Sequence, residues 1–585
     1  MDLSLKKFLM LKEFKIASAI SFNVFISDSL ALTTSFKPFL IPLLTDSPDT
    51  FTKPVFLFFK TKKTRRKSGV TPIWEKYFID VVLLGVSIYL LFNYNKQIST
   101  LSAGVINGDG IDPVIFINAT LFLFACGMLM LRIIFYIVRL VFRIGEKKYS
   151  PVTYAGFVQI IRTRKASGVI SIFLVMTVAM SIFNAGLART INSNKEDRLR
   201  YECGTDVRIQ EKWKITMIKQ GSFVRWKYTE PDYSAYQSLI DDGTFKKATK
   251  VMISDRSSVI ANGKQPVDVK LMGINTKEFG ETASLKDGLT EEHWYNYLNA
   301  LAAEPEGAII SRNLADFLEV KVGDLLVCQM KSPKITGISE IYASAPGKVV
   351  AIVDAWPGFN SYSYITNEDG KTVEKPGYFI VMNYTNTVNC FNLLPYEVWT
   401  KTDSGREEVV ERLNESYGDR TRYVEDIRSW RDELREEKST AIIQITNGIF
   451  TADFLVALLL CIIGYMIYWI TSIRDRELLF GIYRAMGIRR GEINRMIGLE
   501  QIFLSLMSIL AGVLAGSLAL RLFVRVFAAV YLPQKHSVSV FISSQVKDLL
   551  EIGCILLFVV LICVVWIRRI VKSLNITEAL KLGDD

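Results

Sequence analysis

Apolar blocks of about 20 residues most constrain how this chain folds, because a helix of that length crosses a hydrocarbon core about 30 Å thick. Half of the 585 residues are hydrophobic, which is high for a soluble protein of this size. The sequence therefore predicts an α-helical integral membrane protein with about six transmembrane helices. The six blocks are residues 77–92, 114–137, 169–188, 454–473, 502–523 and 549–567.

Ionisable residues are rare within these blocks. Asp80, Arg132 and Asp453 lie in or beside block ends. Burial in a helix bundle or snorkelling makes such residues tolerable there. We therefore favour a structural role for all three over a proton or ion relay.

Basic residues beside the blocks indicate orientation, since Lys and Arg are retained on the cytoplasmic side of a membrane. With six crossings, the basic segments 60–69, 474–490 and 568–573 fall on one side, together with both chain ends. The other side then holds a long insert at about residues 190–440. This insert has 33 basic and 39 acidic side chains, whereas the remaining residues have 37 and 20. The net charge of +11 therefore follows membrane orientation and indicates no nucleic-acid partner.

The insert has the composition of a folded extracytoplasmic α+β domain. Runs rich in β-branched and aromatic residues at 347–356 and 376–384 predict strands. Residues 406–438 carry many charges, with apolar residues at three- and four-residue spacing, and predict a charged helical stretch. We expect its apolar stripe to pack on its own domain; a partner-binding surface is the alternative.

The chain offers little material for catalysis or metal binding. The insert contains three of the seven cysteines, Cys203, Cys328 and Cys390, an odd number without CxxC spacing. A disulfide framework is therefore disfavoured, although one pair stays open. The two histidines, His293 and His536, lie in no metal-ligand motif. We predict no catalytic residues, no metal site, no cofactor in this chain and no enzymatic activity.

The segment ELLFGIYRAMGIRRGEINR, residues 477–495, is polar and basic but lies between two apolar blocks. Its spacing predicts an amphipathic helix along the inner membrane surface. A short turn at Met486, Gly487 and Ile488 would protrude from it. The simpler alternative is a helix that only caps the bundle.

The wider stretch RDRELLFGIYRAMGIRRGEINRMIGLEQIFLSLMSILAGVLAGSLAL, residues 474–520, resembles the FtsX/MacB-type permease domain of ABC transporters. That family has a Glu, an apolar run, then Arg-Ala-hydrophobic-Gly, before a Gly-rich helix that contains Glu. Gly512 and Gly516 have the small-xxx-small spacing that lets two helices approach closely. The positions that match the family pattern are Glu477, Gly481, Arg484, Ala485, Met486, Gly487 and Glu500.

Three further segments are similar to parts of the same family: residues 154–175, segments within 308–358, and the tail at 575–583. The resemblance thus covers about residues 152–585. It implies the following division of the chain: an atypical N-terminal segment 1–70, a transmembrane linker pair 71–145, an amphipathic helix with a span 152–189, a MacB-like domain 190–440, and an FtsX-like permease domain 441–585.

The resemblance also implies a function. Permeases of this family couple ATP hydrolysis by a separate ABC ATPase to movement of their extracytoplasmic domain, for export or extraction of peptide, lipid or lipoprotein substrates. A scaffold that regulates an extracellular partner such as a cell-wall hydrolase is the alternative. No GxxxxGK[ST] phosphate loop is present, so a partner must bind the ATP. The ATPase-docking residues that carry over are Glu477, Gly481, Arg484, Ala485, Met486, Gly487 and Ile488.

Further expectations concern assembly and location. The family implies a second permease copy or half, because an ATPase dimer presents two docking sites. We expect the protein in a bacterial plasma membrane, in contact with lipid, with both termini cytoplasmic.

The N-terminal region departs from the family pattern. The first two blocks resemble the linker pair of ten-span permeases, but the unit that precedes this pair there has no counterpart here. Residues 1–59 leave three interpretations open: a signal peptide, a spanning helix weakened by Asp28, or a truncated or frame-disturbed product of a longer permease. The last would make the chain inactive by itself.

Overall fold

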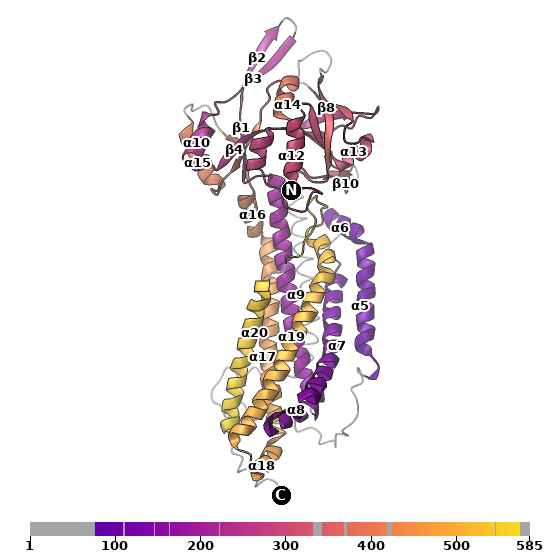
Figure 1. Cartoon of the computed structure of the whole chain (residues 1–585), viewed down its shortest axis with the longest axis vertical. Coiled ribbons are helices and arrows are strands. Elements are labelled where there is room, and N and C mark those ends of the chain that lie inside the picture. Colours follow the sequence, from indigo (N-terminus) through magenta and orange to yellow (C-terminus); the bar gives the residue numbers. More distant parts are fainter. Residues whose placement is uncertain are drawn as a thin grey trace. The chain divides into compact units, whose positions relative to one another are not determined.

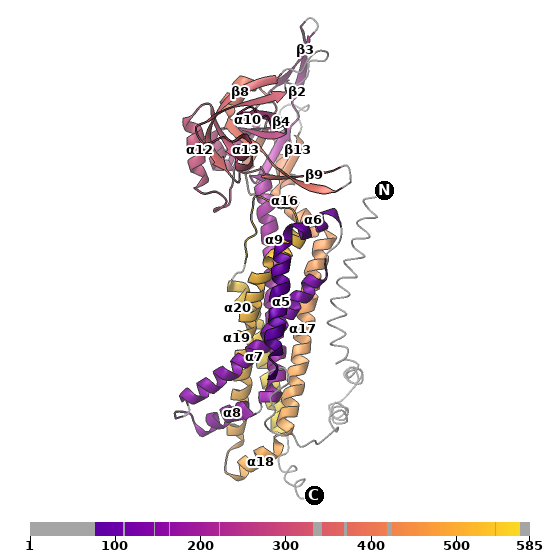
Figure 2. The same ribbon diagram turned by 90° about the vertical axis from the view of Figure 1, so that its right-hand side faces the viewer.

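The computed structural model describes residues 76–573, apart from 109–111, 146, 163, 221–222, 332–341, 368–370, 418–423 and 544–545. The N-terminal segment 1–70 and the expected tail 575–583 lie outside this part. The chain forms two compact units (Figures 1 and 2). One is helical and takes in the described residues up to Thr190, Thr446–Tyr531 and those from Ile542 on. The other, called the outside domain below, consists of Ile191–Ile445 and Leu532–Phe541.

Long apolar helices dominate the helical unit, as the block lengths predicted. Four helical segments in the described part are long and apolar enough to cross a membrane: Val114–Gly145, Gly168–Cys203, Thr451–Arg474 and Gly491–Tyr531. The predicted spans 77–92 and 549–567 coincide largely with α5 and α20. The helices are α5 (Ile79–Lys96), α6 (Ile98–Asn107), α7 (Val114–Gly145), α8 (Pro151–Arg162), α9 (Arg164–Cys203), α17 (Ala441–Arg474), α18 (Glu477–Ala485), α19 (Arg490–Tyr531) and α20 (Val546–Ser573).

Charged residues of the spans are paired inside the bundle. Arg132 on α7 donates to the fully buried carboxylate of Asp80 on α5 over 2.8 Å. The side-chain amide of Asn184 on α9 donates to Asp453 on α17 over 2.6 Å. These contacts give all three ionisable groups a structural partner, which is what a polar group within a membrane requires.

Two glycines let α19 approach α9 closely. A Cβ added at Gly512 would lie 2.6 Å from Cβ of Val178, and one at Gly516 would lie 2.5 Å from the carbonyl oxygen of Ala179. Real Cβ atoms do not come so close to such atoms. A larger residue at either position would therefore push the two helices apart.

The outside domain is built around a mixed sheet of nine strands in the order β13-β1-β12-β4-β5-β11-β6-β8-β7. Most neighbours are antiparallel, but β5 and β11 are parallel, as are β6 and β8. Figure 1 shows the helices of this domain beside the sheet. Together with the apolar helices, this domain confirms the predicted fold class. The strands of the sheet are β1 (Val207–Glu211), β4 (Lys247–Ile260), β5 (Val269–Ile274), β6 (Gly307–Ser311), β7 (Leu325–Lys331), β8 (Tyr342–Val353), β11 (Phe379–Asn383), β12 (Glu397–Lys401) and β13 (Val424–Ser429).

Hydrophobic side chains from the sheet and its helices form two buried clusters. One of them contains the fully buried rings of Trp356, Trp399 and Phe279, and Phe279 stacks on Trp356 with ring centroids 5.9 Å apart. The helices of the domain are α10 (Ser234–Asp241), α11 (Thr276–Thr282), α12 (Trp294–Ala303), α13 (Arg312–Leu318), α14 (Tyr384–Phe391), α15 (Arg406–Ser416) and α16 (Trp430–Ser439).

Two strand pairs stand apart from the nine-stranded sheet. β2 (Lys214–Gln220) pairs only with β3 (Phe223–Thr229) among the described strands, and β9 (Tyr362–Thr366) pairs only with β10 (Thr372–Pro376). In the β2–β3 hairpin, Ile215 and Met217 are 53% and 61% exposed. This hairpin therefore presents apolar side chains that its own domain does not cover.

The predicted charged helical stretch at 406–438 is wrong in its middle. The structure has α15 and α16 there, with strand β13 between them. β13 pairs antiparallel with β1, so that Ile427 lies opposite Ile209 and is 6% exposed. The pairing extends the sheet by one strand and buries Ile427, an advantage that local helix spacing does not reveal.

All seven cysteines are free in the part of the chain that the structure describes, so the cysteine pair that the sequence left open does not form there. Cys328 on β7 is fully buried in the larger hydrophobic cluster. Burial raises the pKa of its thiol to about 12, which keeps it protonated and unreactive at neutral pH.

Candidate functional site

The helix α18 ends in a sharp turn at the position that the sequence predicted. Gly487 has φ +91°, its N–H donates to the carbonyl of Arg484 over 3.0 Å, and the N–H of Ile488 donates to the carbonyl of Tyr483 over 3.1 Å. This pair of bonds is a Schellman motif, in which the left-handed residue is usually glycine because it has no Cβ. Gly487 therefore sets the direction in which the chain leaves α18 for α19.

The turn presents side chains on one face and is anchored by the other. Met486 is 74% exposed, and Arg484, Ala485 and Arg489 are exposed beside it. An exposed methionine next to arginines suits binding to a protein surface. We call residues 484–489 the docking turn, after the ATPase-docking role that the family resemblance implies for them.

The anchoring face was only partly predicted. Phe480 is 5% exposed and shares a hydrophobic cluster with Trp469, Ile493 and Met496. Ile488 packs against the same cluster. Of the remaining predicted residues, Glu477 is the first residue of α18 and Gly481 is buried within it. Phe480 was not among the predicted residues, whereas Ile482, two residues further on in the same helix, is 48% exposed.

A buried ion pair joins the start of α18 to α19. Arg476 Nη1 lies 2.7 Å from Glu500 Oε2, and Arg476 Nη2 lies 3.2 Å from Glu500 Oε1. The side chain of Glu500 is fully buried and that of Arg476 is 10% exposed. Such a fork-to-carboxylate contact fixes the geometry as well as the charge. Glu500 was found through the family pattern. Its partner Arg476 was missed, although a carboxylate within a span normally pairs with a nearby polar or charged group.

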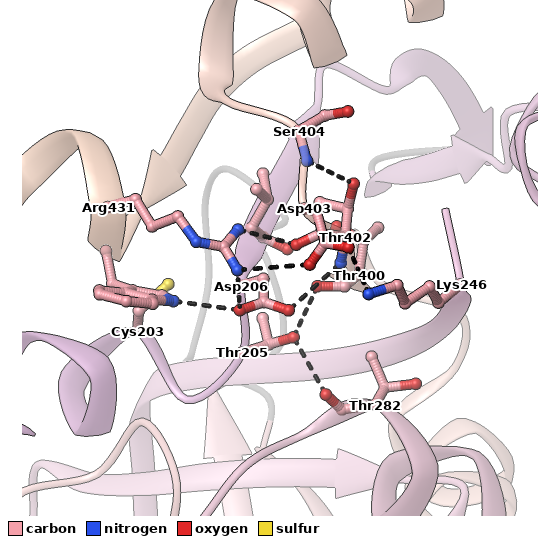
Figure 3. Close-up of polar contacts among 12 residues, drawn as sticks. Cys203, Thr205, Asp206, Lys246, Thr282, Thr400, Thr402, Asp403, Ser404 and Arg431 are labelled. Atoms are coloured by element: carbon pink, nitrogen blue, oxygen red, sulfur yellow. Dashed lines mark hydrogen bonds and ion pairs between the residues drawn. The ribbon is translucent and has the colours of Figure 1, made fainter. Parts of the chain in front are cut away.

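A second polar network lies in the outside domain, where α9 ends and α16 begins (Figure 3). The Asp206 carboxylate accepts hydrogen bonds from the backbone N–H of Thr402 over 3.2 Å, from Trp430 Nε1 over 3.1 Å and from Arg431 Nη2 over 3.3 Å. Arg431 Nη1 donates to the carbonyl of Thr402 over 2.8 Å. Asp206 thus ties together the segment after α9, the segment after β12 and the first turn of α16. No local sequence pattern predicted this network.

Threonines and an exposed ion pair extend the network in Figure 3. The hydroxyl of Thr205 donates to the carbonyl of Thr400 over 2.8 Å. Lys246 pairs with Asp403, and its hydrogen bond lowers the pKa of the Asp403 carboxyl. This region is therefore held mainly by many modest contacts.

The described residues contain no group of three or more His, Cys, Asp or Glu side chains arranged to hold a metal ion. His293 Nδ1 accepts a hydrogen bond from the N–H of Tyr295 over 3.3 Å and caps α12. His536 Nε2 lies 3.2 Å from Glu202 Oε1. His293 thus has a local contact in its own helix cap, and His536 has a contact with a residue far away in the sequence.

Residues 454–576 match the family model described as FtsX-like permease C-terminal. This stretch is similar to the C-terminal domain of FtsX-like permeases. The match runs from within α17 through α18 and the docking turn to α19 and α20, which confirms the resemblance seen in the sequence. The family model covers this C-terminal part of the chain, and the apolar helices of the same part are those of a membrane protein.

No curated protein matches the chain. Among solved structures, it is similar to the periplasmic region of MacB from Actinobacillus actinomycetemcomitans, with 10% identity and a TM-score of 0.23, over 41% of this chain and 95% of that one. The extracellular domain of the noncanonic ABC-type transporter YknZ from Gram-positive bacteria has 13% identity and a TM-score of 0.22, over 37% of this chain and 100% of that one. A domain of a Porphyromonas gingivalis protein has 13% identity and a TM-score of 0.20, over 39% of this chain and 88% of that one. At these values the likenesses carry no argument about activity.

Proposed function

We propose that this protein is the permease subunit of an ABC transporter and that its docking turn binds a separate ATPase. The match of residues 454–576 to the FtsX-like permease domain carries this proposal. The exposed Met486 and Arg484 beside the left-handed Gly487 supply a fixed, protruding contact surface of the kind that such docking needs. ATP would be bound by the partner, and this chain would hold no cofactor and perform no catalysis.

Two contacts make the docking turn suitable for transmitting force. The Arg476–Glu500 pair and the buried Phe480 hold α18 against the first part of α19. A force on the docking turn would then move α18 and α19 together, because the segment that precedes α18 is held to α19 by the ion pair. Closure of an ATPase dimer would in this way move membrane helices.

The work done outside would be the export or extraction of a peptide, lipid or lipoprotein. In this proposal, a second permease copy or half occupies the other docking site of the ATPase dimer, in a bacterial plasma membrane with both termini cytoplasmic. Net charges of opposite sign on the two parts of the sequence support that orientation.

A second function is favoured by one observation. The β2–β3 hairpin exposes Ile215 and Met217, and exposed apolar side chains often mark protein-binding surfaces. A non-transporting scaffold that regulates an extracellular protein, such as a cell-wall hydrolase, would use such a surface. It would need the same ATPase inside.

Affinity purification of the full chain from membranes tests the docking proposal. Arg484→Glu reverses an exposed charge, and Gly487→Trp places a side chain where φ is +91°. The matched control is Arg256→Glu, an exposed arginine of the outside domain. We expect an ABC ATPase to co-purify with wild type and the control and to be lost from both docking variants. Wild type without any ATPase would refute the proposal.

A further inference from the structure

The loop between α19 and α20 belongs to the outside domain. Residues Leu532–Phe541 group with Ile191–Ile445 and not with the helices that precede and follow them. We call these ten residues the strap. Since α19 ends at Tyr531, its last residue is joined directly to the strap.

A buried asparagine holds the far end of the strap. Asn194 is 2% exposed; its Nδ2 donates to the carbonyl of Phe541 over 2.7 Å, and its Oδ1 accepts from the N–H of Phe541 over 2.8 Å. This side chain pairs with both polar groups of one peptide unit, as a neighbouring strand would.

A second asparagine holds the middle of the strap. Asn360 Oδ1 accepts from the N–H and from the hydroxyl of Ser537, each over 3.0 Å, and the N–H of Ser361 donates to the same hydroxyl over 2.8 Å. Val538 is 2% exposed and packs with Tyr201. The strap is thus bound through its backbone and through a buried apolar side chain.

Further contacts fix the first half of the strap. The guanidinium of Arg198 donates to the carbonyl of Gln534 over 3.0 Å. The N–H of Lys535 donates to the hydroxyl of Tyr364, and Lys535 Nζ lies 3.2 Å from Glu374. Contacts along the whole segment mean that the strap cannot follow α19 without moving the domain or breaking these bonds.

The inner end of α19 is also held, by the Arg476–Glu500 pair and by the Phe480 cluster. The docking turn therefore lies between two helices that both lead to the outside domain. α17 leads there through α16, which precedes it in the chain, and α19 leads there through the strap. α9 (Arg164–Cys203) also runs into the domain as one continuous helix, so the connections through α17 and through the strap act in addition to α9.

We propose that α19 drives the outside domain through the strap, with Asn194 and Asn360 as the positioning residues that clamp it. The proposal rests on the proposed ATPase docking and adds the route by which that event reaches the domain. Without the clamp, α19 would move and the strap would slide on the domain. The predicted defect is uncoupling: ATP is hydrolysed, but the domain does not respond.

The test uses the full chain with its co-purified ATPase in nanodiscs. One variant combines Asn194→Leu with Asn360→Leu, which removes both clamps. A second inserts Gly-Ser-Gly-Ser between Tyr531 and Leu532, which leaves the clamps intact and slackens the connection. Asn296→Leu on the surface of α12, where the side chain is exposed, is the control. The readouts are ATPase co-purification, ATP hydrolysis, and hydrogen exchange of residues 191–445 with ATP and vanadate against no nucleotide.

In wild type and control we expect ATP to change hydrogen exchange of the outside domain. In both strap variants this change should fall at least about fivefold, while co-purification and hydrolysis persist. An unchanged exchange response in the insertion variant would overturn the inference, even if the double variant fails to fold. Loss of the ATPase from wild type itself would instead refute the docking proposal on which the inference rests.

Discussion

The docking turn and the Asp206 network are both held by polar contacts, but in different ways. Near the docking turn, the polar connection between the start of α18 and α19 is the single ion pair Arg476–Glu500, whose carboxylate is fully buried, and it lies beside the Phe480 cluster. In the outside domain, Asp206 accepts from three donors on two segments: the backbone N–H of Thr402, and the side chains of Trp430 and Arg431 on α16. Removing one partner of the buried ion pair leaves an unpaired charge among apolar side chains and should cost a large free energy. Removing Asp206 leaves some of the hydrogen bonds around it in place and should cost less.

The largest effect is expected from breaking the buried pair. Glu500→Ala leaves the Arg476 guanidinium buried without its counter-charge and should destabilise the helical unit by about 3–5 kcal/mol. Thermal unfolding of the detergent-solubilised protein measures this. The exchanged pair Arg476→Glu with Glu500→Arg should recover part of the loss. If the exchanged pair is no more stable than the single variant, the Arg476–Glu500 pair does not stabilise the helical unit.

A pair of glycines gives the next largest effect. Gly516→Ala would place a Cβ 2.5 Å from the carbonyl oxygen of Ala179 and should cost about 1–3 kcal/mol through overpacking. Gly487→Ala meets open space and should cost about 1–2 kcal/mol through its left-handed backbone alone. The two variants should differ in ATPase binding. We expect only Gly487→Ala to reduce ATPase co-purification at temperatures where both variants are folded. Equal loss of docking in both would contradict this.

Removing the shared acceptor tests the distributed network. Asp206→Ala leaves Trp430 Nε1 and Arg431 Nη2 without that acceptor, but Arg431 keeps its 2.8 Å bond to the carbonyl of Thr402. We expect a loss of about 1–3 kcal/mol in the unfolding of the outside domain. Chemical denaturation followed by tryptophan fluorescence checks it, with Asp206→Asn as the milder companion. A loss as large as that for Glu500→Ala would remove the contrast between the two regions.

The smallest expected effect is the dependence of stability on pH through the carboxyl group of Glu230. Partial burial opposes ionisation of Glu230, but hydrogen bonds from Lys250 over 2.7 Å and Tyr396 over 2.8 Å outweigh it and lower its pKa. The contribution of this carboxylate is therefore present above the unfolded pKa of about 4.3 and is lost as pH falls through the lower folded value. Because Glu230 is a third exposed, we expect less than about 1 kcal/mol.

Glu230→Gln tests the sign of this linkage. Wild type should be more stable than the variant at neutral pH, and the difference should shrink as acid protonates Glu230. Urea unfolding of both proteins across this range measures the difference. A gap that widens towards acid pH would show that the pKa is raised in the folded state and not lowered.

Much of the fold followed from local sequence features. The blocks of about 20 apolar residues predicted membrane helices because helix length and hydrocarbon thickness are matched. The docking turn was predicted because an amphipathic run ends at Met486 and Gly487, and glycine takes a left-handed turn without strain. Such features depend on residues within one or two helical turns of each other, so they are readable without a structure.

The tertiary structure decided which distant residues meet. β13 became a strand because β1 offers it hydrogen bonds and a buried place for Ile427, over 200 residues away in the chain. The same holds for the ion pair between Arg476 and Glu500 and for the hydrogen bond between Asp206 and Trp430. It also holds for the hydrogen bonds of the strap with Asn194 and Asn360. Local periodicity contains no information on such partners, because the free energy of each contact appears only when packing has removed both groups from water.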